Sequence, residues 1–298
     1  MELRTKILGA AITSAILTGG FSANVLADSQ INDWGLNLTN VIASQFGSVV
    51  NAGLNSLQFS GESYDQLTSL DPSTGAFSFT DTGVYNVTAD QNGKALNLGF
   101  GLINGTTPQT GELTAVFKAS GTGILGQSFT FSGSAGDSLA IYAQAYGIAE
   151  YGTTANNSFG AANGVLIAQF SELPGGGGSI QTNGLPTDNG QVTLQYRASY
   201  LAPGVWQDSR GNNLPATLTL GFITSNASVD SSNPINPMLV AGLGGASSNS
   251  LAIPDLHFYT QNGGQIKLEL STVPVPGAIW LFGTAFAGLI GFMRRKPK

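Results

Sequence analysis

Two pairs of carboxylates are the residues of this chain whose types could support catalysis. Glu62 is followed closely by Asp65, and Glu150 precedes Glu172 further along the chain. Two facing carboxylates hydrolyse glycosidic bonds when they flank the bond at a set separation, one of them acting as the acid. Sequence spacing does not supply that separation. Scattered surface acids are therefore the favoured interpretation of both pairs.

Nucleophilic and metal-assisted chemistry has little support in the sequence. The chain has a single histidine, His257, and no cysteine. A serine nucleophile needs a positioned base, and zinc or thiol sites need several histidines or cysteines. The glycine run 175–178 lacks the lysine and following helix of a phosphate-binding loop. We expect His257 to lie in a strand, and we predict no catalytic residue and a non-enzymatic protein.

Calcium is the one cofactor worth considering, although no metal site is predicted. The segments 90–93 (DQNG) and 188–190 (DNG) place oxygen-bearing side chains on turns. Calcium takes six to eight oxygen ligands, and neither segment resembles a complete calcium loop. Turn formation explains both segments adequately.

Several aromatic residues could stack on sugar rings or could instead fill a core. Trp206 lies in the segment 202–208 (APGVWQD), whose proline, glycine and polar residues indicate an exposed loop. We take Trp206 and Tyr200 as the candidate glycan contacts. The other aromatic residues considered, which are more typical of a core, are Trp34, Tyr151 and Tyr196.

Charge and composition restrict the classes of partner. Between Asp28 and Pro276 the chain carries five basic residues against 16 carboxylates, a net charge of −11. Nucleic-acid binding requires a basic surface, so a nucleic-acid partner is not expected. Because the chain has no cysteine, no disulfide stabilises the fold, and stability must come from packing.

Apolar and polar residues alternate with a period of two through most of the interior of the chain, which is typical of half-buried strands. Asn-Gly and Gly-Gly pairs between these runs, at 92–93, 104–105, 189–190 and 263–264, supply the positive φ of hairpin turns. The sequence therefore predicts an all-β antiparallel sandwich or jelly roll. The main predicted strands are 76–79, 84–87, 95–100, 113–117, 128–131, 165–170, 192–196, 216–223, 256–259 and 265–270.

Four segments allow more than one interpretation. Residues 36–50 fit either a short amphipathic helix or a strand followed by a loop, and 138–150 fit either a helix or a strand. The run 174–179 (PGGGGS) is predicted to be a flexible surface loop, with a boundary between two sub-domains as the alternative. Residues 231–250, rich in Ser, Asn, Pro and Gly, are predicted to form another loop.

Both ends of the chain have the composition of export signals. Residues 1–27 combine a basic start, an apolar stretch and a small-residue site before the Ala27–Asp28 bond, as a cleaved signal peptide does. At the other end, 277–293 is an apolar run that would span roughly 25 Å as a helix, just enough to cross a bilayer core. It is followed by the basic cluster Arg294, Arg295 and Lys296, which favours a cytoplasmic end. A plain membrane anchor is the simpler alternative.

The C-terminal string 273–296 (VPVPGAIWLFGTAFAGLIGFMRRK) resembles the PEP-CTERM sorting signal of Gram-negative bacteria, in its Val-Pro-Val-Pro variant. The resemblance covers about a tenth of the chain. It implies that an exosortase, a membrane cysteine protease or transpeptidase, recognises the tail and cuts near residues Pro274, Val275 and Pro276. This sequence lacks the glutamate of the commoner motif, so the resemblance does not fix the bond that is cut.

A shorter resemblance concerns residues 60–67 (SGESYDQL) followed by 71–77 (DPSTGAF). Together with the sorting tail and the Asn/Gly-rich strands, these segments are similar to the flocculation-associated PEP-CTERM proteins. The resemblance implies a role in holding cells in aggregates.

These observations predict three parts: a signal peptide at 1–27, an extracellular β domain at 28–272 and a sorting signal at 273–298. The expected function is that of an exported surface or extracellular-matrix protein that supports aggregation, biofilm or exopolysaccharide association. Its expected partners are an exosortase, exopolysaccharide or other surface proteins and, before processing, the membrane. Two alternatives remain open: a lectin-like polysaccharide-binding module, and a secreted glycosidase or lyase.

Overall fold

The computed structural model describes residues 29–42, 47–185, 187, 190–216, 219–230 and 234–270. The chain from Ser29 to Ser271 forms one compact unit, and the run 174–179 does not divide it. The predicted signal peptide and sorting signal lie outside the described residues. Within the described residues, no helix combines the length and apolarity needed to cross a membrane.

The architecture is all-β and antiparallel, as predicted, with two short helices. The main sheet contains β1 (Ser29–Gln30), β4 (Ser56–Leu70), β5 (Ala76–Asp90), β8 (Glu112–Ile124), β9 (Ser128–Phe131), β10 (Ser138–Gln144), β11 (Val165–Ser179), β12 (Gly190–Leu201), β14 (Thr219–Val229) and β15 (His257–Leu270). Two small sheets hold β2 (Trp34–Asn37), β3 (Val50–Leu54) and β13 (Trp206–Asp208), and β6 (Phe100–Ile103) and β7 (Thr107–Thr110). The helices are α1 (Asn156–Phe159) and α2 (Pro237–Leu243).

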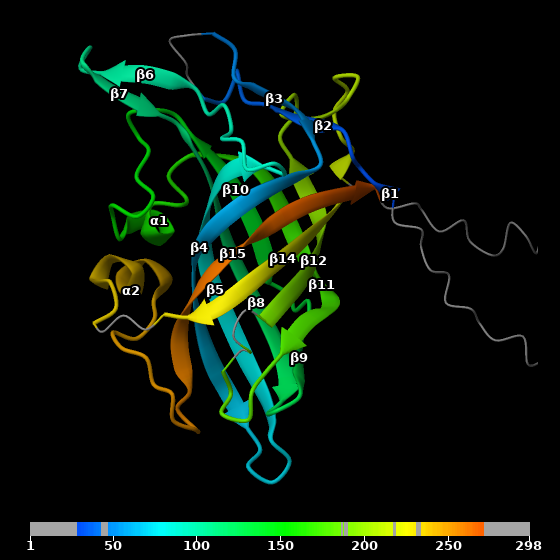
Figure 1. Ribbon diagram of the computed structural model, residues 1–298, viewed down its shortest axis with the longest axis vertical. Coiled ribbons are helices and arrows are strands. Elements are labelled where there is room, and N and C mark those ends of the chain that lie inside the picture. The colour runs from blue at the N-terminus through cyan, green and yellow to red at the C-terminus, as the bar shows by residue number, and fades with distance from the viewer. Residues whose placement is uncertain are drawn as a thin grey trace, which may run out of the picture. The chain divides into compact units, whose positions relative to one another are not determined.

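The main sheet closes on itself. Eight long strands pair in the order β4, β5, β8, β10, β11, β12, β14 and β15, and β15 then pairs with β4 over eleven residue pairs. Neighbours in this order follow one another along the chain, apart from the short strands between them (Figure 1). The layers that face each other across the core therefore belong to one continuous sheet. An eight-stranded closed sheet leaves an interior that side chains fill or that holds one small ligand.

Glycines on the inner face make room for aromatic rings. A Cβ atom on Gly83 would lie 2.1 Å from Cε1 of Phe117, and one on Gly61 would lie 2.6 Å from Cδ1 of Tyr85. The rings of Tyr85 and Phe117 stack with centroids 4.9 Å apart. Each glycine is the cross-strand partner of its ring on the neighbouring strand, Gly61 opposite Tyr85 and Gly83 opposite Phe117, and the missing Cβ leaves room for the ring.

Most predicted strands are confirmed. The segments 113–117, 128–131, 165–170 and 192–196 lie in strands β8, β9, β11 and β12. The runs 76–79 and 84–87 belong to one strand, β5. The segment 95–100 is irregular except for one bridge at Ala95 and the start of β6, so that strand prediction is wrong. Residues 138–144 form a strand, as one alternative proposed, and the strand-then-loop interpretation holds for the described part of 36–50.

Two glycine-rich predictions are wrong. The run 174–179 is not a loop, because it forms the second half of β11 and pairs with β9 and β12. A Cβ atom on Gly177 would lie 2.0 Å from the carbonyl oxygen of Phe129, so glycine permits the close approach of these strands. The predicted turn at 261–264 lies in the middle of β15, where β4 and β14 pair with it on both sides. The loop predicted at 231–250 contains α2.

One end of the closed sheet is covered by the small sheet of β2, β3 and β13, and we call it the capped end (Figure 1). Trp34 from β2 and Trp206 from β13 stack there, with ring centroids 5.6 Å apart. Each ring is 1% exposed, and Nε1 of Trp206 donates a hydrogen bond of 2.8 Å to the carbonyl oxygen of Ile167. This end is a close-packed apolar core, in which Nε1 of Trp34 has no hydrogen-bond partner among the described residues.

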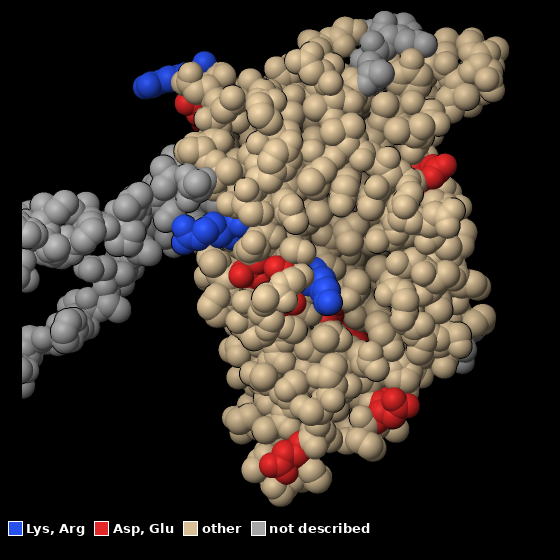
Figure 2. All heavy atoms as spheres, turned by 180° about the vertical axis from the view of Figure 1, so that it is seen from behind, with Lys and Arg blue, Asp and Glu red and all other residues tan. Residues whose placement is uncertain are grey.

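The two helices lie against the outer face of the sheet, on the side of β4, β5 and β15 (Figure 1). They form a second, smaller apolar cluster in which Phe159 of α1 and Leu239 of α2 pack around Val84 and Tyr259. On the face shown in Figure 2 charged side chains are few, and several of both signs lie next to one another near its middle.

Candidate functional site

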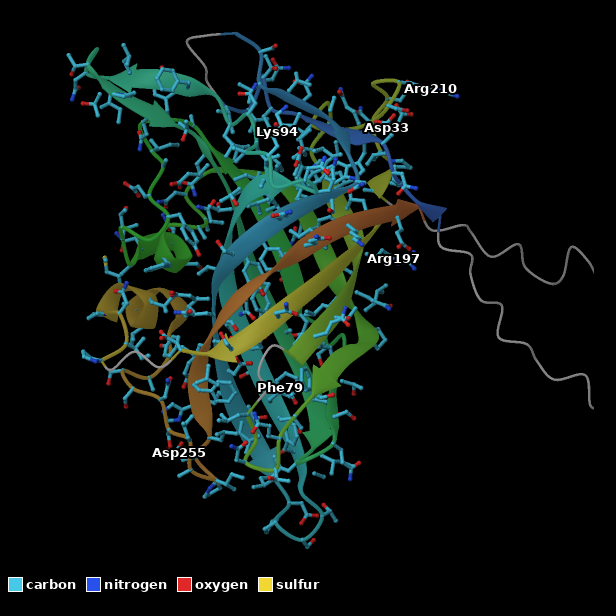
Figure 3. The ribbon with its side chains drawn as sticks, viewed as in Figure 1. Asp33, Phe79, Lys94, Arg197, Arg210 and Asp255 are labelled. Atoms are coloured by element: carbon cyan, nitrogen blue, oxygen red, sulfur yellow. The ribbon has the colours of Figure 1, made fainter. Side chains whose placement is uncertain are left out.

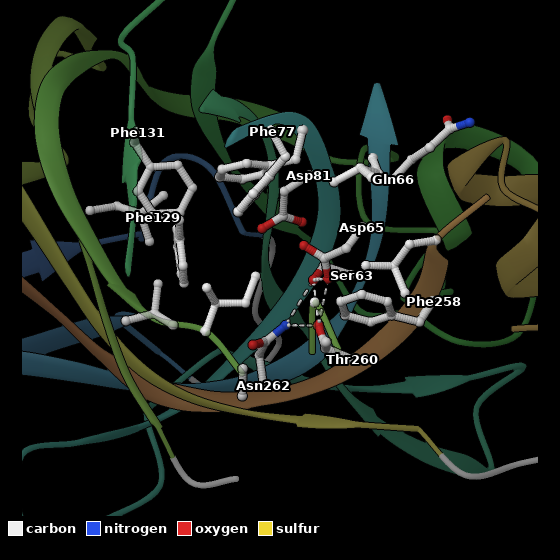
Figure 4. Close-up of a pocket in the computed structure, with 18 of the residues that line it drawn as sticks. Ser63, Asp65, Gln66, Phe77, Asp81, Phe129, Phe131, Phe258, Thr260 and Asn262 are labelled. Carbon is white, nitrogen blue, oxygen red and sulfur yellow. Dashed lines mark hydrogen bonds between the residues drawn. The ribbon is translucent and has the colours of Figure 1, made fainter. Parts of the chain in front are cut away.

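The interior of the sheet contains a cavity of about 70 Å³ at the end opposite the capped end. Asp65 of β4 and Asp81 of β5 project into it (Figure 4). These residues are direct cross-strand partners. Opposed residues in an antiparallel pair have Cβ atoms about 4.5–5.5 Å apart, so the two carboxyl groups are close neighbours. We call this region the acidic cavity.

A group of three neutral polar side chains surrounds Asp65. Oγ of Ser63 and Oγ1 of Thr260 lie 2.6 Å apart, and they lie 3.5 Å and 3.3 Å from Oδ2 of Asp65. Nδ2 of Asn262 donates to both hydroxyl oxygens at 3.0 Å (Figure 4). Each hydroxyl has one proton, so one hydroxyl donates to Asp65 while the other donates to its neighbour. The group thus directs its donors toward one oxygen of Asp65.

The acidic cavity raises the pKa of both aspartates above the usual range. Desolvation is the main cause for each carboxyl group, and the charge of Asp65 adds to the effect on Asp81. Hydrogen bonds from Thr260 and Ser63 to Asp65 oppose its rise in pKa. Two adjacent carboxyl groups in such a site oppose each other's ionisation.

A further acid lies on the same inner face, in β11. Glu172 is buried, and desolvation together with nearby Asp137 raises the pKa of its carboxyl group to about 8. Asp137 is buried as well, and its Oδ2 accepts hydrogen bonds from the backbone and hydroxyl of Ser120 at 3.1 Å and 2.6 Å. Asp81 and Tyr196 both experience the charge of Glu172. The buried acids are therefore neighbours in pairs: Asp65 and Glu172 each lie near Asp81, and Asp137 lies near Glu172.

Aromatic rings form the apolar wall of the cavity. Phe79, Phe129 and Phe131 contact one another edge to face, with centroids 5.5–5.7 Å apart. In Figure 3, Asp33, Lys94 and Arg210 lie at the capped end, and Phe79 lies away from that end. None of the residues that line the cavity in the described part of the chain is Lys, Arg or His.

The structure does not bring together either carboxylate pair considered from the sequence. Glu62 lies in a groove on the outer face beside Tyr151, while Asp65 points inward. Glu150 accepts a hydrogen bond from Asn163 beyond one end of β10, whereas Glu172 lies near the other end of that strand. Neither pair can flank one bond, so the acids are separate groups. The interpretation of both pairs as surface acids is wrong for Asp65 and Glu172, which lie inside the sheet.

The aromatic predictions divide. Trp206 is not an exposed glycan contact, because its ring fills the capped end against Trp34. The surrounding proline and glycine form a turn that folds the ring inward. Tyr200 is 40% exposed and stays a candidate contact. His257 begins β15, as predicted for a strand residue, and its Nδ1 lies 3.4 Å from Oδ1 of Asp255.

The segment 90–93 forms a turn, in which the carboxylate of Asp90 accepts hydrogen bonds from the backbone of Asn92 and Lys94. Residues 188–189 lie outside the described residues. Across the described ranges, no group of three or more His, Cys, Asp or Glu side chains is placed to hold a metal ion. The processing residues Ala27, Asp28, Pro274, Val275 and Pro276 and the basic cluster 294–296 also lie outside the described residues.

The sequence analysis did not find Asp81, Ser63, Thr260 or Asn262 as site residues. A signal was present, since Asp65 and Asp81 interrupt apolar alternation in two strands that a short turn joins. Reading that hairpin in register would have placed the two acids opposite each other. No protein family, curated protein or solved structure significantly matches this chain.

Proposed function

We propose that the protein is an exported, non-enzymatic surface or extracellular-matrix protein that supports cell aggregation, biofilm or exopolysaccharide association. The observation that carries the proposal is the C-terminal sequence, which joins the Val-Pro-Val-Pro motif, an apolar run and a basic end. An exosortase would process this tail, and the protein would be anchored in the inner membrane only until then.

The ends of the folded body support this proposal. β1 pairs with the end of β15, so that Ser29 lies opposite Leu270. The predicted signal-peptide bond is one residue before Ser29, and the sorting motif begins three residues after Leu270. The described body therefore begins and ends at one edge of the sheet, and each predicted processing site is only a few residues away in sequence.

The orientation of β15 adds a second argument. It lines the acidic cavity with Phe258, Thr260 and Asn262 and ends at Leu270, where it pairs with β1. At about 3.3 Å per residue, Asn262 and Leu270 lie roughly 25 Å apart along the strand. Attachment near the C-terminal end of β15 would leave the cavity about that far from the attachment point. The sparse charge of the exterior suits a protein that stays soluble outside the cell.

A lectin-like module is the second candidate function, and exposed Tyr200 is the observation that favours it. Because Trp206 is buried, Tyr200 is the one exposed ring of the two predicted glycan contacts, which weakens the lectin-like alternative. The glycosidase alternative is weaker, because neither predicted carboxylate pair faces a common cleft.

Mass spectrometry of the protein from envelope and medium tests the proposal. We expect a mature N-terminus at Asp28 and a C-terminus near Pro274 to Pro276. A variant with both prolines of the motif replaced by alanine should keep its tail and remain in the inner membrane. Recovery of the intact chain, ending at Lys298, from the soluble cytosol would overturn the proposal.

Deletion of the gene tests the biological role separately. We expect weaker aggregation or biofilm, restored by the wild-type gene and not by a copy lacking residues 273–298. Normal aggregation after deletion would reject the role in aggregation but would leave the export proposal standing.

A further inference from the structure

The acidic cavity is an interior site bordered by two carboxyl groups, and no Lys, Arg or His is among the lining residues that the structure describes. Asp65 and Asp81 border it, with Glu172, Asp137, Tyr85 and Tyr196 as the other titratable groups on the facing elements. Strand β15 contributes Thr260 and Asn262, which do not titrate. Buried carboxylates are normally paired with a cation, so this arrangement is incomplete by itself.

The hydrogen bonds of the site leave one carboxylate oxygen without a donor. Of the hydroxyls of Ser63 and Thr260, one donates to Oδ2 of Asp65 and the other to its neighbouring hydroxyl, and Asn262 donates to both. Oδ1 of Asp81 is buried and has no hydrogen-bond partner. A buried acceptor without a donor costs about 1–3 kcal/mol, which a bound donor would recover.

The remaining walls favour an organic cation. Phe79, Phe129 and Phe131 surround the apolar side of the cavity, and aromatic faces attract cations. A ligand that matches both walls has a charged N–H group at one end and a short hydrocarbon at the other. The cavity volume of about 70 Å³ limits that hydrocarbon to a few carbon atoms.

We propose that the acidic cavity binds a small organic ammonium ion, which donates to Asp81 and Asp65 and packs its hydrocarbon against Phe79 and Phe129. A neutral alcohol has one donor and no charge, and a carboxylate would be repelled. Binding at the acidic cavity does not depend on the sorting tail, so rejection of this proposal would not reject the proposed function, and the reverse also holds.

Calorimetry or ligand-detected NMR of purified full-length protein in mild detergent tests the site. The probe is n-propylammonium, and 1-propanol and propionate are controls of matched shape. We expect n-propylammonium to bind at least about tenfold more tightly than 1-propanol, because hydrogen bonds to charged groups contribute about 1.5–3 kcal/mol. Propionate should not bind. Affinity for n-propylammonium should rise between pH 5 and pH 8, because the carboxyl groups of Asp65 and Asp81 lose protons over this range and their negative charge attracts the cation.

Two variants locate the site. Asp81→Asn should weaken n-propylammonium binding about tenfold or more, while Asp33→Asn, which changes an exposed carboxylate, should leave the affinity within about twofold. Asp65→Asn is the second variant, should Asp81→Asn fail to fold.

Three outcomes would overturn the proposal. They are equal affinity for n-propylammonium and 1-propanol, unchanged affinity in a folded Asp81→Asn or Asp65→Asn variant, and no binding of n-propylammonium at millimolar concentration. In the last case the cavity holds only water. The comparison among the three probes needs no variant, so a folding defect does not remove the test.

Discussion

The two ends of the closed sheet solve the same packing problem in opposite ways. At the capped end, Trp34 and Trp206 stack out of solvent, and Nε1 of Trp206 finds an acceptor on Ile167. At the other end, phenylalanine rings surround a cavity in which Asp65 and Asp81 oppose each other. One end buries large apolar rings, and its polar cost is the indole N–H of Trp34, which is buried without a hydrogen-bond partner in the described part of the chain. The other keeps desolvated acids and an unfilled volume.

The difference indicates which end provides stability and which is available for binding. Burial of large rings gains free energy, whereas adjacent buried acids cost free energy unless they share protons or meet a cation. A region that costs stability and persists in the fold is a candidate for function. Removal of a ring at the capped end and removal of a charge at the acidic cavity should therefore change the free energy of unfolding with opposite signs.

The largest effect is expected from Trp206→Ala at the capped end. Loss of the ring leaves a cavity beside Trp34 and removes the hydrogen bond to Ile167, which should lower the free energy of unfolding by about 3–5 kcal/mol. Denaturant unfolding measures the change. Tyr200→Ala, at an exposed ring, should stay within about 0.5 kcal/mol. Similar losses of unfolding free energy in Trp206→Ala and Tyr200→Ala would contradict the conclusion that the capped end is a close-packed core.

Added volume near the acidic cavity should also destabilise the protein. The Cβ atom of Gly83→Ala would lie 2.1 Å from Phe117, and we expect a loss of roughly 1–3 kcal/mol from overpacking. Gly263→Ala is the matched control in a strand, because its Cβ would have no neighbour closer than 4.0 Å. Thermal unfolding of both variants makes the comparison. An unaffected Gly83→Ala would show that the inner face can repack.

Loss of charge at the cavity should have the opposite sign. Asp81→Asn removes a desolvated acid opposite Asp65 and should raise the free energy of unfolding at pH 8 by about 1 kcal/mol. Asp33→Asn, at an exposed site, should have no measurable effect. Destabilisation by Asp81→Asn at pH 8, in the absence of ligand, would mean that the aspartate pair is a stabilising structural feature.

The smallest effect concerns the pH dependence of stability. The pKa of Glu172 is raised from 4.5 to about 8, so the folded state binds its proton more tightly than the unfolded state does. Its stabilising contribution is complete below pH 4.5 and is lost as the pH rises toward 8. The raised pKa values of Asp65 and Asp81 act in the same direction.

Unfolding curves across this pH range should show higher stability at pH 5 than at pH 8. Glu172→Gln should make the decline shallower, and Glu150→Gln, at an exposed carboxylate, should not. A steeper decline in Glu172→Gln would contradict the assigned direction of the pKa shift.

Strand prediction succeeded where apolar and polar residues alternate strictly, as in β8 and β12, because period two reports a half-buried strand directly. It failed where glycines dominate. The run 174–179 and the segment 261–264 have loop composition, yet pairing on both sides holds them in strands. Trp206 was misjudged for a related reason, since its neighbours describe a turn but not the direction of the ring.

The sequence by itself determined the local properties: strand-forming alternation, turns such as Asn104–Gly105, the charge balance, and the composition of the two ends. Those properties depend on residues within a few positions of one another. The closure of β15 on β4, the stacking of Trp34 on Trp206 and the meeting of Asp65 with Asp81 were decided only by the tertiary structure. Each joins separate strands, and which strands meet depends on the packing of the whole sheet.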